Sequence, residues 1–422
     1  MKIPGMRKTA IALTVLAVSA CGQTVAGSPG AGEIDVRKLE AGKYPTQPMD
    51  SYYSYTHSVR SGTSLAITRL ADHVVLGSDI DSKLRYGTGI HAVDQPDDVA
   101  SSMAEQSKDV AKRNKMQFGF VSGSSDTEPV PHNKVPATST LVTVTVLQFP
   151  SADAASTASR EFEESDFNVN PEENRTVPIS KFPTAYAHWR PGTPTIGSTI
   201  AHGNYTVSVF VSTASADLSM LTSMVEKTYT VQLPMLDELR PLSPEEVLRA
   251  EHDPEDMKRR VLDPSKTAVP GVGDMATNRP HGFLHFETDR ESSKKLYSAG
   301  NVEYVTMGQA YSSQTYSYSN GIAQSFGTGS SKLLDGAILF RSRDEDSAKT
   351  LWSSLVAKPD AAMNPVGVPD AKCAEELMPW SSAKHFTCVV RYRNYVGTVW
   401  STQPQDAQQR AAAQYAVLAN SQ

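Results

Sequence analysis

The same order of predicted secondary structure occurs twice along the chain, and this repeat restricts the fold more than any other feature. In the first half, apolar periodicity predicts a strand, a helix, a strand, a hairpin and a helix at residues 141–149, 151–167, 185–190, 195–212 and from Asp217 onward. In the second half it predicts a strand, a helix, a hairpin and a helix at residues 336–341, 344–357, 385–401 and 406–418. The sequence therefore predicts an α+β fold with two similar domains. Each is a mainly antiparallel sheet with helices on one face, in strand–helix–strand–strand–helix order.

Two further observations bear on the domain organisation. The predicted hairpins share the short identity Asn204-Tyr205 and Asn394-Tyr395, which favours an internal duplication. Between the halves lies a polar, proline-rich segment, in which Ser243-Pro-Glu-Glu246 has the pattern of a helix capping box. We expect an N-terminal domain at residues 34–240, a helical linker at 241–273 and a C-terminal domain at 274–422.

The N-terminus has the pattern of an export signal at residues 1–20. Three basic residues precede a short apolar stretch, which at nine residues cannot span a bilayer. Val-Ser-Ala-Cys at 18–21 resembles the bacterial lipobox, which implies cleavage before Cys21 and its acylation, for instance with palmitate. The alternative is an ordinary secreted protein that happens to carry a cysteine there. The composition of residues 21–33 predicts a flexible tether with an r.m.s. end-to-end distance of about 18 Å. We expect the protein to be anchored through Cys21 on the outer face of the cytoplasmic membrane.

Cys373 and Cys388 are the two cysteines that remain after Cys21. In an exported chain, a pair only 15 residues apart in sequence is most simply a structural disulfide. A redox-active or metal-binding pair is the alternative, although the C-x-x-C spacing that favours redox chemistry does not occur.

Composition excludes some classes of protein. Of the 422 residues, 39% are hydrophobic and 20% charged, as in globular proteins and unlike mostly disordered ones. No apolar run beyond the N-terminus is long enough for a membrane span. The formal charge is −6, and removing a leader with three basic and no acidic residues makes it −9. We therefore expect no nucleic-acid partner.

A family resemblance rests on six short segments of the mature chain. They are GEIDVRKL (32–39), YPTQP (44–48), RLADHVV (69–75), DID (79–81), FTC (386–388) and NYV (394–396). With the lipobox, they resemble an uncharacterised family of actinobacterial lipoproteins. The resemblance covers most of the mature chain and implies a two-part lipoprotein of the mycobacterial and nocardial envelope. It implies no catalytic or binding residue.

Patterns for common chemistry are absent or incomplete in the sequence. No G-x-S-x-G motif occurs, and the Gly-Ser-rich residues 327–332 do not satisfy the phosphate-loop pattern. His281 and His285 are predicted on a strand, where about 13 Å would separate them, so we expect no metal site. The acidic cluster at Glu161, Glu163, Glu164 and Asp166 is predicted to be a solvated helix face. We expect no cofactor.

An aromatic segment from Tyr304 to Phe326 is the strongest candidate for a binding surface. Tyrosine and serine alternate around Tyr311, Tyr316 and Tyr318, which in an extended stretch would present rings on one face. For the segment as a whole, half-buried strands or an ordered loop are the favoured interpretation.

The sequence thus favours a non-catalytic envelope lipoprotein that acts as an interaction or ligand-binding module for an envelope protein or a lipid or glycan ligand. The alternatives are a carrier of lipid or another envelope molecule, and an unrecognised envelope hydrolase. The sequence does not predict the oligomeric state.

Overall fold

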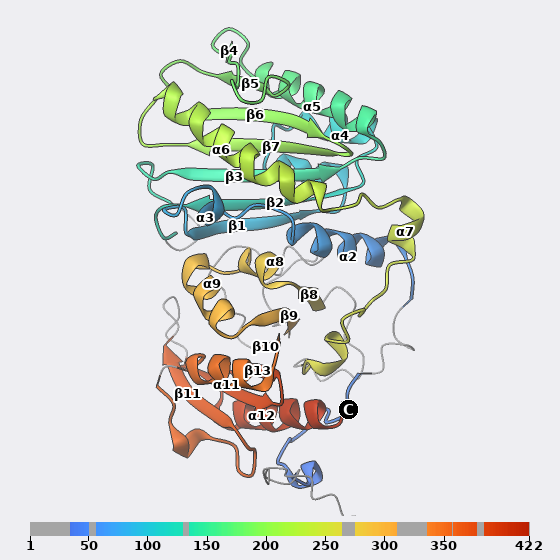
Figure 1. The fold of residues 1–422 in the computed structure, drawn as a ribbon, viewed down its shortest axis with the longest axis vertical. Helices are drawn as coiled ribbons and strands as arrows, with labels where there is room; N and C mark the ends of the chain where they lie inside the picture. The colour runs from blue at the N-terminus through green and yellow to red at the C-terminus, as the bar shows by residue number, and fades with distance from the viewer. Residues whose placement is uncertain are drawn as a thin grey trace, which may run out of the picture. The chain divides into compact units, whose positions relative to one another are not determined.

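The first domain is built on a seven-stranded antiparallel sheet in a computed structural model of the chain. The structure describes residues 34–49, 56–129, 135–263, 275–309, 336–356, 358–377 and 384–421. The strand order is β1-β2-β3-β7-β6-β5-β4 (Figure 1). The strands are β1 (Tyr86–Val93), β2 (Phe118–Ser125), β3 (Leu141–Gln148), β4 (Arg175–Thr176), β5 (Tyr186–Trp189), β6 (Thr195–His202) and β7 (Tyr205–Ser212).

The second domain has a six-stranded antiparallel sheet in the order β11-β12-β13-β10-β9-β8. Its strands are β8 (Met275–Asn278), β9 (Val302–Gln309), β10 (Gly336–Ser342), β11 (Ala371–Leu377), β12 (Lys384–Tyr392) and β13 (Tyr395–Ser401). The predicted α+β class, with two domains on mainly antiparallel sheets, is confirmed.

The described helices precede, connect and follow these strands. In the first domain and the connector they are α2 (Val59–Ala71), α3 (Gly77–Ile80), α4 (Ser107–Arg113), α5 (Ala152–Phe167), α6 (Leu218–Asp237) and α7 (Pro244–Leu248). In the second domain they are α8 (Pro280–Leu284), α9 (Arg290–Ala299), α11 (Glu345–Ser354) and α12 (Pro404–Ala419). Short 3-10 turns are η1 (Val36–Lys38), η2 (Pro96–Ser101), η4 (Lys258–Arg260) and η6 (Ala361–Met363). None of the helices in these described ranges has the length and apolar character needed to cross a bilayer.

Helices cover both faces of the first sheet, where the sequence predicted them on one face. Val146 belongs to the core formed with α2 and α6, whereas Leu147 belongs to the core formed with α4 and α5. Because successive side chains of a strand point to opposite faces, these two helix pairs lie on opposite sides. The physical reason is that the central strands are buried on both faces, as every residue of β2 shows.

The two sheets repeat one topology. From its β1 edge, the first sheet contains its first three strands in chain order, then its last strand, and then the remaining strands in reverse order. The second sheet has the same arrangement when it is followed from its β8 edge. The shared hairpin asparagines have equivalent bonds. The Asn204 carbonyl accepts from the Phe149 N–H, and the Asn394 carbonyl accepts from the Ser342 N–H. Each side-chain amide donates back to the carbonyl of the same partner residue.

Local capping explains why these segments are helical where the sequence predicts helices. Ser151 Oγ accepts the N–H of Ala154 at the start of α5. Asp344 caps α11 in the same way through the N–H of Ser347. At α7, Ser243 and Glu246 exchange the two bonds of the predicted capping box.

One predicted strand is wrong. The segment around His281 and His285 forms the short helix α8, which begins at Pro280. Proline at the first helical position favours this start. The Asp72 carboxylate, more than 200 residues earlier, accepts the N–H groups of Arg279 and Gly282 at 3.0 Å each. The cap comes from another part of the fold, so the local pattern did not reveal it.

Candidate functional site

The structure places only some of the predicted site residues. Cys21 and the tyrosines Tyr311, Tyr316 and Tyr318 lie outside the described residues. Tyr304, at the start of the aromatic segment, is half-buried on β9, and the Arg341 guanidinium lies 4.5 Å from its ring centre.

A disulfide joins Cys373 to Cys388 with an S–S distance of 2.03 Å. The two residues lie directly opposite each other on β11 and β12. Both side chains are buried, with exposed fractions of 0% and 1%. Since β11 is the edge strand of the second sheet, the disulfide ties this edge to the strand beside it.

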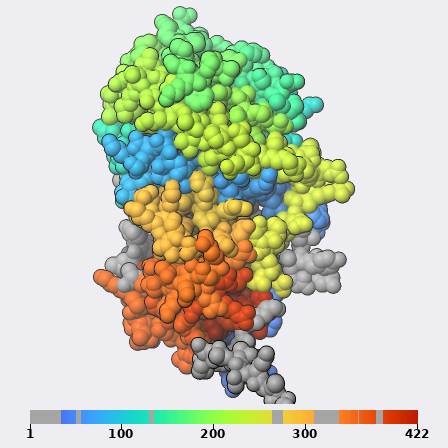
Figure 2. Space-filling model, in the orientation of Figure 1, coloured from blue at the N-terminus to red at the C-terminus, as the bar shows by residue number. Residues whose placement is uncertain are grey.

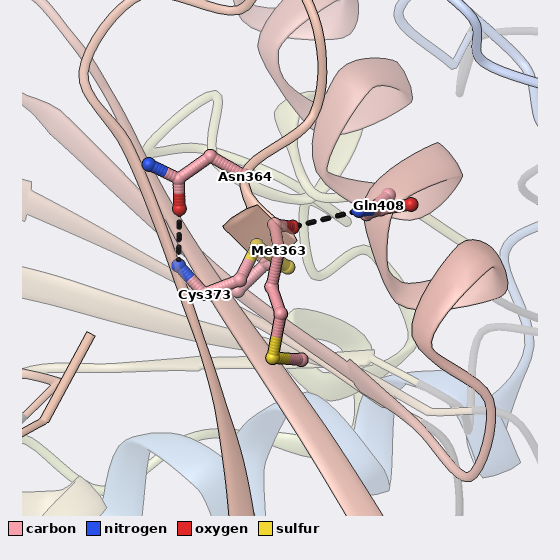
Figure 3. The surroundings of a disulfide bond; sticks show 5 residues. Met363, Asn364, Cys373 and Gln408 are labelled. Atoms are coloured by element: carbon pink, nitrogen blue, oxygen red, sulfur yellow. Dashed lines mark hydrogen bonds between the residues drawn. A yellow bond between two sulfur atoms is a disulfide. The ribbon is translucent and has the colours of Figure 1, made fainter. Parts of the chain in front are cut away.

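The loop before β11 is attached around this disulfide (Figure 3). The Asn364 side-chain oxygen accepts the Cys373 N–H at 2.9 Å. The Cys373 carbonyl in turn accepts the Asp360 N–H at 2.8 Å. On the other side, Gln408 of α12 donates its side-chain amide to the Met363 carbonyl at 2.9 Å. The segment from η6 to β11 is therefore held from two sides.

The segment that follows the predicted tether is fixed against α12. The Tyr44 hydroxyl donates to Asp406 at 2.6 Å and accepts from Arg410 Nε at 2.8 Å. Arg410 also pairs with Asp406 at 2.8 Å. Burial and the bond to Asp406 raise the pKa of Tyr44, so its hydroxyl is neutral. Near the end of α12, Asn420 donates its side-chain amide to the Thr46 carbonyl. Residues 36–49 thus belong structurally to the second domain.

This N-terminal segment meets the loop before β11. A side-chain carbon added to Gly367 would lie 3.7 Å from Leu39 Cδ2. The turn η1, which opens the compact unit from Val36 to Gln422, immediately precedes Leu39. The point at which the chain enters this unit therefore lies beside the loop.

A second polar assembly, which we name the interdomain seam, joins α2–β2 of the first domain to α8–α9 of the second. His281 Nε2 and His285 Nε2 both approach the Val74 carbonyl, at 2.8 and 3.0 Å. His285 Nδ1 lies 2.7 Å from the Ser122 hydroxyl. Because a carbonyl oxygen can only accept, Nε2 of His285 carries the hydrogen and donates to Val74. Nδ1 is then the acceptor for the Ser122 hydroxyl. Burial and the charge of Arg290 hold the pKa of His285 well below its usual value, so the ring is neutral at pH 7.

Arg290 is the most buried charged side chain of the seam, with an exposed fraction of 0%. Its guanidinium donates to the Ser124 hydroxyl at 2.7 Å and to the His285 carbonyl at 3.1 Å. Burial lowers the pKa of Arg290 to about 10, which still leaves it charged at pH 7. Gly87 on β1 has no side chain, and a Cβ there would lie 3.0 Å from the guanidinium. The space beside Gly87 is therefore filled by the Arg290 guanidinium.

Backbone bonds complete the seam. The Gly87 N–H donates to the Thr288 carbonyl, and the Arg290 N–H donates to the Arg85 carbonyl. Beside them, Arg85 pairs with Asp289. These bonds pair the start of the β1 edge of the first sheet with the second domain. In the space-filling view, the blue surface of the first domain meets the yellow-orange surface of the second directly (Figure 2).

The acidic cluster on α5 differs from its prediction. Glu163 is not part of a solvated face, because its side chain is 12% exposed and bonds His188 Nδ1 at 2.8 Å. Burial raises the pKa of Glu163. Burial also opposes charging of His188, but its bond to Glu163 and the charge of Glu163 raise the His188 pKa overall. Glu164 does lie at the surface, paired with Arg160. The prediction was wrong for Glu163 because its partner comes from β5.

The described ranges contain no group of three or more histidine, cysteine, aspartate or glutamate side chains placed to hold a metal ion. His281 and His285 do share a helix face, with ring centres 5.8 Å apart. Their Nε2 atoms are both directed to the same backbone carbonyl.

Comparison with protein families matches both domains. Residues 53–252 match the N-terminal domain of unknown function DUF7373, and residues 257–421 match the DUF7373 C-terminal domain of unknown function. The chain belongs to the DUF7373 family. No curated protein matches the chain.

The family boundaries clarify the two assemblies of this DUF7373 chain. The interdomain seam joins the two family domains, since Ser122 lies in the first match and Arg290 in the second. The described residues 36–49 precede the first match, yet they pack on the second domain. Sequence reasoning missed both assemblies, because each partner lies more than 150 residues away from the group it bonds.

Proposed function

We propose that this DUF7373 protein is an exported, lipid-anchored protein of an actinobacterial envelope, and that its two domains act as a non-catalytic interaction or ligand-binding module. The export pattern at residues 1–20 and the lipobox-like Val-Ser-Ala-Cys at 18–21 support the anchor. The flexible composition of residues 21–33 supports a tether between the lipid and the folded unit.

The attachment of residues 36–49 to α12 is the observation that carries this proposal. Tyr44, Asp406 and Arg410 form a hydrogen-bonded cluster that fixes the first folded segment to the last helix. A tether that enters here is tied to the second domain at a defined place. This arrangement supports a body held at the membrane by its N-terminus.

The use of polar groups in the interdomain seam supports a non-catalytic role. His281 and His285 bond backbone and serine oxygens, and Arg290 fills the space beside Gly87. General base catalysis needs a ring nitrogen within reach of a substrate proton. In the seam these groups hold the domains together instead.

The anchor is tested by fractionating cells that express the full chain and the Cys21→Ser variant. We expect the wild-type protein in the detergent phase of a membrane extract, labelled by an alkyne analogue of palmitate. Cys21→Ser should be unlabelled and should leave the membrane fraction. Gly22→Ala, which keeps the cysteine, is the matched control and should behave as wild type. Membrane retention and labelling of Cys21→Ser would show that the anchor proposal is wrong.

The non-catalytic part is tested with active-site-directed hydrolase probes on the exported chain. We expect no labelling by serine-, cysteine- or glycosidase-directed reagents. Labelling that disappears on substitution of one serine, histidine or acidic residue would contradict the proposal and support the hydrolase alternative.

A further inference from the structure

The place where the chain enters the folded unit carries an unusual surface, which we name the anchor-end surface. It consists of residues 36–43 and the loop 361–369, which meet at Leu39 and Gly367. Arg37, Lys38 and Lys43 are all exposed on the first of these segments. The surface therefore combines basic side chains with the loop that is held beside the disulfide.

The charge of the anchor-end surface is opposite to that of the chain as a whole. Residues 34–49 contain three basic side chains and two acidic ones, Asp35 and Glu40. Residues 361–369, Ala-Ala-Met-Asn-Pro-Val-Gly-Val-Pro, contain no charged side chain. The full chain has a formal charge of −6. The described entry segment of this acidic protein thus carries a net formal charge of +1.

The loop also exposes apolar side chains. Val366 is 90% exposed, the largest exposed fraction among the large hydrophobic residues at the described surface. Ala361, Ala362 and Pro369 in the same loop are exposed as well. Bonds from Asn364 to Cys373 and from Gln408 to Met363 hold the loop from behind. Val366 is therefore presented on a supported loop, beside other exposed apolar side chains.

The acidic residues that flank the loop are engaged in local contacts. The Asp360 carboxylate accepts the N–H of Ala362, which caps η6. Asp370 pairs with Arg391 of β12. The Arg391 guanidinium offsets the charge of the Asp370 carboxylate, and Asp360 lies at the exposed start of the loop.

We propose that the anchor-end surface docks on an anionic lipid bilayer, with Lys38 and Lys43 at the phosphate groups and Val366 inserted at the head-group level. This inference rests on the proposed function, because the lipid-anchored tether is what brings the surface near the bilayer. The tether's reach of about 18 Å is short enough to keep this end of the unit next to the membrane. Basic side chains beside exposed apolar groups are the combination that binds such interfaces.

Screening explains how an acidic protein can dock in this way. At 0.1 M salt the Debye length is about 10 Å, so acidic groups far from the contact interact only weakly with the lipid charge. Basic side chains at the contact lie within that distance. Each is expected to strengthen binding to an anionic surface about five-fold. The local charge therefore determines the attraction.

Vesicle co-sedimentation tests the proposal without lipidation. The chain from residue 21 to 422 with Cys21→Ser is mixed, in 0.1 M salt, with vesicles of phosphatidylcholine alone or with 30% phosphatidylglycerol. We expect binding to the anionic vesicles only. Lys38→Glu/Lys43→Glu should weaken it about 25-fold or more, from the loss of two basic residues. Val366→Asp should weaken it about ten-fold, and Val366→Trp should strengthen it because tryptophan favours the interface.

Matched controls lie on the first domain. Lys83→Glu/Lys181→Glu makes the same charge change at exposed lysines, and Val169→Asp replaces another exposed valine, 59% exposed. Both controls should stay within two-fold of the unsubstituted chain. Circular dichroism should show that every variant retains the fold, since all the substituted side chains are exposed.

Two results would overturn the proposal: no binding of the chain to anionic vesicles, or equal binding by the anchor-end and control variants. The first would leave the surface to a protein partner. The assay uses a chain that cannot be acylated at residue 21, so it does not depend on the anchor. If the chain does not bind anionic vesicles but the wild-type protein is anchored to the membrane in cells, only the docking surface is rejected. Failure of the fractionation experiment rejects the anchor alone.

Discussion

Ser124 is the residue through which the coupling of the two domains can be tested most directly. Its hydroxyl, on the buried strand β2, accepts from Arg290 of the second domain at 2.7 Å and from the Gly77 N–H at 3.1 Å. Replacing Ser124 by alanine removes one oxygen atom and adds no bulk. It leaves a fully buried guanidinium with one acceptor fewer, and it leaves the Gly77 N–H without this bond.

The expected cost follows from these two losses. A hydrogen bond to a charged group contributes about 1.5–3 kcal/mol, and an unsatisfied buried N–H costs about 1–3 kcal/mol. Neighbouring losses are not additive, because the seam can relax around both. We therefore expect Ser124→Ala to lower the free energy of unfolding by about 3 kcal/mol.

The assay is urea unfolding of the exported chain, followed by hydrogen exchange with mass spectrometry. Ser159→Ala is the matched control, since Ser159 is equally buried but bonds only the Ser156 carbonyl of its own helix. It should cost less than about 1 kcal/mol. Because Arg290 belongs to the second domain, Ser124→Ala should also speed exchange in α8 and α9.

Two outcomes would refute this reasoning. One is a loss in Ser124→Ala no larger than that of Ser159→Ala. The other is faster exchange confined to the first domain, which would show that the seam does not couple the stability of the two domains.

Three further predictions concern the seam and the disulfide. Burial raises the pKa of Asp72 to about 7, above its usual 3.8, so its contribution to stability is complete below pH 4 and is lost as the pH rises to about 7. The free energy of unfolding from urea titrations should therefore shift in favour of Asp72→Asn over that range by roughly 4 kcal/mol, whereas a pH-independent difference would contradict the assignment. Gly282→Ala would place a carbon 2.1 Å from the Asp72 carboxylate and should lower Tm by several degrees more than Gly197→Ala, where the nearest atom would lie at 3.4 Å. Replacing Cys373 and Cys388 together by alanine should cost about 3 kcal/mol in thermal or urea unfolding, and an unchanged midpoint would refute a stabilising role.

Much of the fold could be predicted because its signals are local. Ser151 lies three residues before the N–H that it caps. The hairpins turn at Gly203-Asn204 and at Arg393-Asn394, between strands that follow each other directly in the chain. Such features depend on φ, ψ and side-chain reach within a few residues, so periodicity and capping patterns predict them. The placement of helices on both sheet faces required knowing that central strands are buried on both sides.

The polar assemblies could not be predicted in the same way. Glu163 lies in an acidic run that looks solvated, and only β5 brings His188 to it. The segment at His281 alternates like a strand, and the distant Asp72 stabilises its helical start. In each case the deciding partner is far away in sequence, and no local pattern contains it.

The sequence by itself determined the kind of protein: a chain with an export pattern, two α+β halves and a cysteine pair. Those properties depend on short-range periodicity, capping and composition, which each segment carries with it. Only the tertiary structure decided which charged and polar groups are buried and what they bond. Burial is a property of the assembled chain, and a guanidinium such as Arg290 can be held away from water only after Ser124 and Gly87 are brought beside it.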